Sequence, residues 1–85
     1  MITHPKTWRL EAGLSLSTVA KQAGIAGANP ARTYDRYERG ESVCPADVIE
    51  RVRAMSDGKV DAESWQSVRL AHIHASANSA EAARL

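Results

Sequence analysis

The segment NPARTYDRYERG places three arginines four and then three residues apart, with two tyrosines between them. At about 100° per residue on a helix, Tyr34 and Tyr37 share one face, and Arg32, Arg36 and Arg39 share the opposite face. Such a helix would bury its aromatic side chains and direct three guanidinium groups outward. A planar guanidinium pairs bidentately with phosphate and with the O6 and N7 atoms of guanine.

A solvated charged face is the alternative reason for such a row, with local pairs such as Asp35 and Arg39. The preceding segment favours a binding role. It predicts a helix capped by Ser15 and ended by Gly24, followed by a turn and then the arginine-bearing helix. In a helix-turn-helix, the second helix enters the major groove of DNA.

Helix signals recur along the whole chain, whereas strand signals are almost absent. We therefore expect an all-α domain of five helices over residues 1–75, followed by a flexible alanine-rich tail over residues 76–85. The expected helix starts or caps are Pro5, Ser15, Asn29 with Pro30, Pro45 and Asp61, and the expected ends of the first three helices are Gly13, Gly24 and Gly40.

Length and composition indicate one small soluble domain. The chain has 85 residues, 44% hydrophobic and 25% charged, with a single cysteine. We expect a cytoplasmic protein without a structural metal or a cofactor, because no segment approaches the ~20 apolar residues of a membrane span and no zinc-ligand spacing occurs. Residues 1–40 hold six basic and three acidic residues, and residues 41–85 hold five and seven. A basic half beside an acidic half fits an anionic partner met on one side.

Two stretches together resemble the Cro and lambda-repressor family of helix-turn-helix regulators. They are GLSLSTVAKQAGI and ARTYDRYERGE, and the resemblance covers residues 5–60. It implies a lambda-repressor-like domain that binds double-stranded DNA, of the XRE type. The turn before the third helix is about four residues longer than the family's, because AGAN lies between Ile25 and Pro30. We expect this loop to bulge while the third helix keeps its place.

The resemblance also implies roles for individual residues. Base reading falls on Ala31, Arg32 and Arg36, and a role for Asp35 stays open between accepting from cytosine N4 and holding an arginine. A structural pair between Arg9 and Glu38 is implied as well. Contacts with the DNA backbone fall on Ser15, Ser17, Lys21, Thr33 and Arg39.

The last predicted helix has more apolar surface than one small core requires. Trp65 and Val68 lie on a different stripe from Leu70 and Ile73. One stripe can close the monomer while the other meets a twin, so these four residues are the candidates for the seam of a C2 homodimer. Such a dimer would place two reading helices about 34 Å apart on a near-palindrome. An edge strand over VRLAHIHA is the alternative form of this seam.

Other chemistry has little support in the sequence. His72 and His74 are two residues apart and point about 200° from each other on a helix, so they cannot chelate one ion. Cys44 is expected to be an idle thiol. No catalytic motif is present, so we expect that the protein is not an enzyme.

The expected function is a DNA-binding regulator, most simply a repressor that blocks a promoter, of the kind found in phages and mobile elements. When bound to DNA it would lie on the bacterial nucleoid. The alternative is a protein-binding antitoxin, or an antagonist of a second regulatory protein, built on the same scaffold. The outward arginines favour the first hypothesis.

Overall fold

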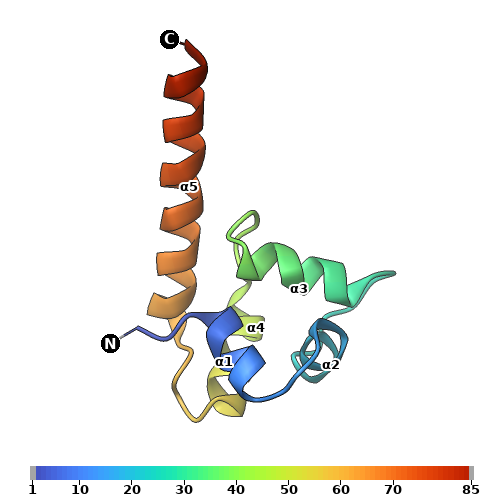
Figure 1. Ribbon diagram of the computed structural model, residues 1–85. Coiled ribbons are helices and arrows are strands. Elements are labelled where there is room, and N and C mark those ends of the chain that lie inside the picture. The colour runs from blue at the N-terminus through green and yellow to red at the C-terminus, as the bar shows by residue number, and fades with distance from the viewer. Residues whose placement is uncertain (1, 85) are drawn as a thin grey trace.

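The computed structural model describes the backbone of residues 2–84 and the side chains of residues 2–75. Within this range the chain forms helices joined by turns and no strand, which confirms the all-α class (Figure 1). Strand pairing over VRLAHIHA is therefore wrong, because these residues lie inside the last helix. The helices are α1 (Pro5–Glu11), α2 (Leu16–Gln22), α3 (Pro30–Glu38), α4 (Ala46–Met55) and α5 (Ala62–Arg84).

Side-chain caps explain where most of these helices begin. Ser15 Oγ accepts the Thr18 N–H at 3.1 Å, and Asn29 Oδ1 accepts the Arg32 N–H at 3.2 Å. Each bond satisfies a backbone donor that has no partner inside its helix. Asp61 does the same for α5. The expected caps are thus present, except that Pro45 precedes α4 without a side-chain cap because proline has no acceptor to offer.

The last helix is longer than the folded domain needs. It continues from Ala62 to Arg84, and its outer half stands free of the other helices (Figure 1). The tail predicted over residues 76–85 falls on this half, and its side chains lie outside the described residues.

The core forms where α3 meets its neighbours. Tyr34 is fully buried, and its ring meets that of Trp65 edge to face, with centroids 5.9 Å apart. This geometry is the favourable one for two aromatic quadrupoles. Val19 and Ala20 of α2 and Val52 of α4 close the core around Tyr34. The tyrosine face of α3 is therefore its anchor.

A buried ion pair joins α1 to the end of α3. Arg9 donates from Nε to Glu38 Oε2 at 2.6 Å and from Nη2 to Glu38 Oε1 at 3.2 Å. Nη1 of the same guanidinium donates to the Leu14 carbonyl at 3.0 Å. The hydrogen bond to Glu38 raises the pKa of Arg9, so the guanidinium stays charged. One side chain thus connects α1, the turn before α2 and α3.

The end of α3 meets α5 at a glycine. Gly40 has a φ of +75°, and a Cβ there would lie 2.5 Å from the Val68 carbonyl oxygen and 2.9 Å from the His72 Cβ. Arg69 Nη1 donates to the Gly40 carbonyl at 2.6 Å from the α5 side. The angle between α3 and α5 therefore depends on a residue without a side chain.

Gly40→Ala should destabilise the fold strongly, because it adds a backbone clash to the strain of a left-handed conformation. Gly13→Ala is a matched control: its φ is +72°, yet nothing lies within 4 Å of its Cβ. We expect Gly13→Ala to lower the free energy of unfolding by about 1 kcal/mol, and Gly40→Ala to lower it by about 2 kcal/mol more. Urea unfolding measures both, and equal losses would show that α5 does not approach Gly40 closely.

Removing one partner of the Arg9–Glu38 pair should cost about 3 kcal/mol, because the other charge stays buried alone. Arg9→Met combined with Glu38→Leu should cost less than either single change. A double-mutant cycle in urea measures this coupling. Additive single losses would contradict a coupled pair.

Candidate nucleic-acid interface

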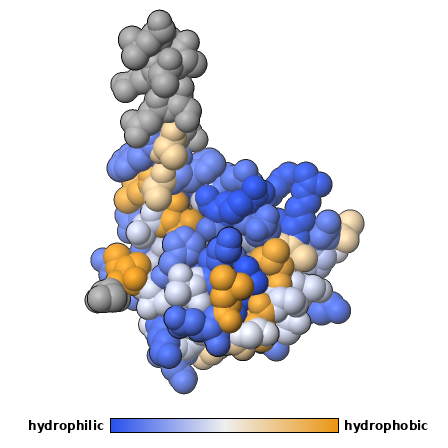
Figure 2. Space-filling model, in the orientation of Figure 1, coloured by the Kyte–Doolittle hydropathy of each residue, from blue (hydrophilic) through white to orange (hydrophobic). Residues whose placement is uncertain are grey.

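The outer face of α3 presents two unengaged guanidinium groups. Arg32 and Arg36 are exposed, and neither forms an ion pair within the described part of the chain. Hydrophilic side chains gather above α3 in Figure 2. A shallow hollow of about 250 Å³ lies between the two arginines and is completed by Asn29 and Thr33. Two free cations beside a polar hollow form a surface that suits an anionic or acceptor-rich ligand.

The other predicted base contact, Ala31, is half-buried at the start of the same helix. Thr33 is half-buried too, and its hydroxyl donates to the Asn29 carbonyl at 3.2 Å. That hydrogen is therefore used inside α3 and is not free for a phosphate. Asn29, which the sequence predicts only as a helix cap, also lines the hollow.

Arg39 differs from the other two arginines of the row. Its Nε lies 3.2 Å from Asp35 Oδ2, and its Nη2 lies 3.0 Å from Glu41 Oε2. Both pairs are at the surface, where such contacts contribute little to stability. They nevertheless hold the guanidinium in place. Of the two roles left open for Asp35, this geometry favours that of holding an arginine.

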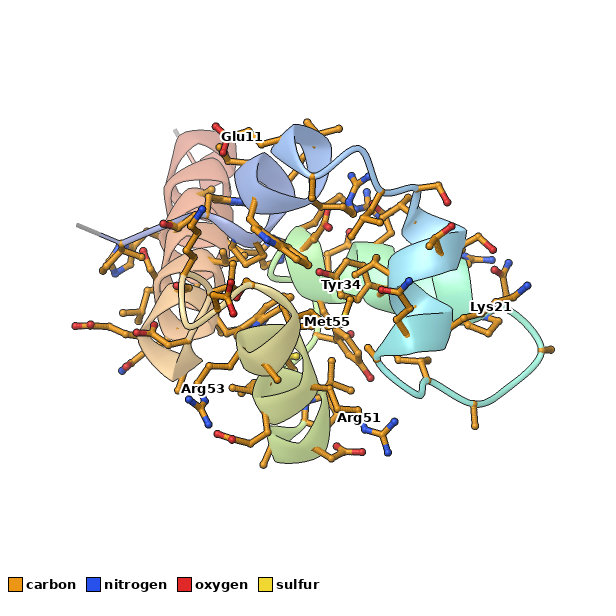
Figure 3. All side chains as sticks on the ribbon, turned by 90° about the horizontal axis from the view of Figure 1, so that it is seen from below. Glu11, Lys21, Tyr34, Arg51, Arg53 and Met55 are labelled. Carbon is orange, nitrogen blue, oxygen red and sulfur yellow. The ribbon has the colours of Figure 1, made fainter. Side chains whose placement is uncertain are left out.

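The residues at α2 that are predicted to contact the DNA backbone differ in whether their polar groups are already used within the protein. Ser15 uses its hydroxyl in the cap, accepting from Thr18 N and donating to Thr18 Oγ1 at 2.9 Å. Ser17 and Lys21 are exposed, and Lys21 points away from the body of the domain (Figure 3). Ser17 and Lys21 are thus the accessible members of this set.

Arg51, for which the sequence predicts no role, supports the turn between α2 and α3. Its guanidinium lies against Gly24 at the carboxyl end of α2, where an added Cβ would collide with it. A cation at this end of a helix also interacts favourably with the backbone dipole. Arg51 therefore packs α4 against the start of the long turn that leads to α3 (Figure 3). No local pattern signals this contact, because the two residues are 27 positions apart.

Two of the four predicted dimer contacts are not at the surface. Trp65 and Val68 are only 5% and 6% exposed because they close the domain's own core. Their stripe is therefore the one that closes the monomer, and they are not available to a dimer seam. Leu70 and Ile73 are 46% and 44% exposed and remain available to a partner.

The remaining reactive groups form no site in the described part of the chain. Burial raises the pKa of the Cys44 thiol to about 12, so it stays protonated at neutral pH. His72 and His74 lie on one helix, and no cluster of three or more potential metal ligands occurs among the described residues. No described helix has the length and apolar character of a membrane span.

Comparison with known proteins adds no assignment. No family model, no curated protein and no solved structure matches the chain.

Proposed function

We propose that the protein is a sequence-specific regulator that binds double-stranded DNA through α3. The observation that carries the proposal is the position of Arg32 and Arg36, which are exposed on the outer face of a helix and form no ion pair with the residues that the structure describes. The opposite face of that helix is anchored by Tyr34 and Glu38, both buried. A rigid anchor is what a reading helix needs, since base contacts depend on fixed side-chain positions.

The shape of the α2–α3 pair is compatible with entry into the major groove. That groove is about 12 Å wide and admits a single α-helix. In a lambda-repressor-like arrangement, α2 would cross the sugar-phosphate backbone with Ser17 and Lys21 while α3 lies in the groove. The long turn between them extends outward from the amino-terminal end of α3 in Figure 1 and does not cover the outer face.

Within the groove, Arg32 and Arg36 would read guanines through O6 and N7. Ala31 would offer a methyl contact to thymine. Occupation of a promoter by such a domain blocks polymerase without any further chemistry, so repression is the simplest regulatory effect. A phage or mobile-element regulator in the bacterial cytoplasm fits this scheme.

Dimerisation is the second part of the proposal. Leu70 and Ile73 lie on the side of α5 opposite Val68, at about 140° and 80° when Trp65 is taken as zero. A twofold pairing of this outer face would bury both side chains. Two copies of α3 would then read the two halves of a near-palindromic operator.

An apolar groove favours a second candidate function, the binding of another regulatory protein. The groove holds about 260 Å³ between α4 and α5 and is bordered by Val43, which is 70% exposed. Leu70 lies at its other edge. An antitoxin or antagonist would use this groove and leave the arginines of α3 free.

Arg32→Ala and Arg36→Ala should each weaken binding to the preferred sequence by about 1–3 kcal/mol and relax the choice of base at one position. Arg53→Ala is the control, because Arg53 is an exposed arginine on α4, paired with Glu50. The test is selection from a random duplex pool at ~150 mM salt, followed by titration of the enriched sequence. Equal effects of all three changes would contradict base reading by α3.

Leu70→Gln with Ile73→Gln should shift the protein from dimer to monomer at micromolar concentration while the fold is kept. Leu10→Gln is the matched control, since Leu10 is 59% exposed on α1. Sedimentation equilibrium gives the association constant for each variant. An unchanged constant in the double variant would exclude this face of α5 as the seam.

A further inference from the structure

A second hollow, lined by apolar as well as nitrogen-bearing side chains, lies away from the base-reading face. It holds about 440 Å³ where α5 passes the end of α3 and the start of α1. Nitrogen-bearing side chains from three segments line it, namely His4, Lys6, Arg39 and His72. We refer to these four residues as the corner. None of the predicted roles accounts for them as a group.

The corner exists because Gly40 has no side chain. The absence of a Cβ lets the Val68 carbonyl and the His72 Cβ approach the end of α3. Arg69 holds this approach through its bonds to the Gly40 and Glu41 carbonyls. His72 is therefore kept beside Gly40, the residue that follows Arg39.

The corner offers donors and one free charge. Lys6 is exposed and forms no ion pair with the residues the structure describes. His4 Nδ1 accepts the Lys6 N–H at 3.1 Å, which places the hydrogen of the neutral ring on Nε2. Glu38 also lines the hollow, but both of its oxygens accept from Arg9, so its charge is balanced.

Arg39 connects the corner to the arginine row. Its Nε and Nη2 pair with Asp35 and Glu41, which leaves Nη1 without a partner among the described residues. Arg39 follows Arg36 by three residues, a rise of about 4.5 Å along the helix. A helix in the major groove has sugar-phosphate backbone at its flanks. Because Arg39 lines the corner at the carboxyl end of α3, a strand that flanked this end of the helix would pass beside the corner.

We propose that the corner binds one backbone phosphate of the DNA, with Lys6 as the charged contact and the histidines and Arg39 as additional donors. This inference rests on the proposed function, because the phosphate belongs to the duplex that α3 reads. Such a contact would fix the register of α3 on the duplex and carry no base preference of its own.

The test is a scan of the enriched operator with single methylphosphonate substitutions, each of which removes the charge of one phosphate. Wild-type protein and Lys6→Ala are titrated against every substituted duplex. We expect one phosphate per half-site whose neutralisation weakens wild-type binding about tenfold and leaves Lys6→Ala binding unchanged. Lys6→Arg should restore the wild-type pattern. Lys59→Ala, an exposed lysine in the turn before α5, is the matched control.

Salt dependence gives an independent readout. The slope of log K against log salt is negative, and loss of one phosphate contact in Lys6→Ala should reduce its magnitude by about 0.9. The enriched sequence itself should not change. If Lys6→Ala and Lys59→Ala have the same slope and the same sensitive phosphates, the corner is not a phosphate site, although base reading by Arg32 and Arg36 would still stand. Absence of any enriched sequence would instead overturn the proposed function.

Discussion

The Arg9–Glu38 ion pair is the constraint on which the position of α3 depends. Glu38 lies at the carboxyl end of α3, where the backbone dipole disfavours a negative charge, and it is buried. It is tolerated there because two hydrogen bonds from Arg9 neutralise it. The third contact of Arg9, to the Leu14 carbonyl, fixes the entry to α2 with the same side chain. The two helices proposed to meet DNA are thus oriented by one residue of α1.

The arginines of this small domain illustrate how one residue type performs several tasks. Arg9 is buried and structural, Arg69 holds the carbonyl end of α3, and Arg51 packs on Gly24. Arg32 and Arg36 alone in the row of α3 are free of ion pairs within the described residues. The guanidinium is suited to all of these tasks because it is planar, permanently charged and rich in donors. Its role is decided by what surrounds it.

The long helix α5 has one part that packs in the core and another that projects from the domain. Its first half supplies Trp65 and Val68 to the core, and the second half extends beyond the other helices (Figure 1). A projecting helix contributes little to a monomer, since isolated helical segments are marginal in water. The residues proposed to meet a twin or DNA, Leu70, His72 and Ile73, lie just before this projecting part.

The helical class, the starts of the helices and the opposed faces of α3 could be predicted from the sequence alone. These features depend on local chemistry: caps, prolines and the 3.6-residue period act within a few residues of one another. The resemblance of two stretches to a known family added the Arg9–Glu38 pair. Long-range packing, which the sequence does not reveal, places Trp65 and Val68 in the core and lets α5 approach α3 at Gly40. Most of these outcomes depend on contacts between segments distant in the chain, and periodicity cannot tell which of two apolar stripes a core will take.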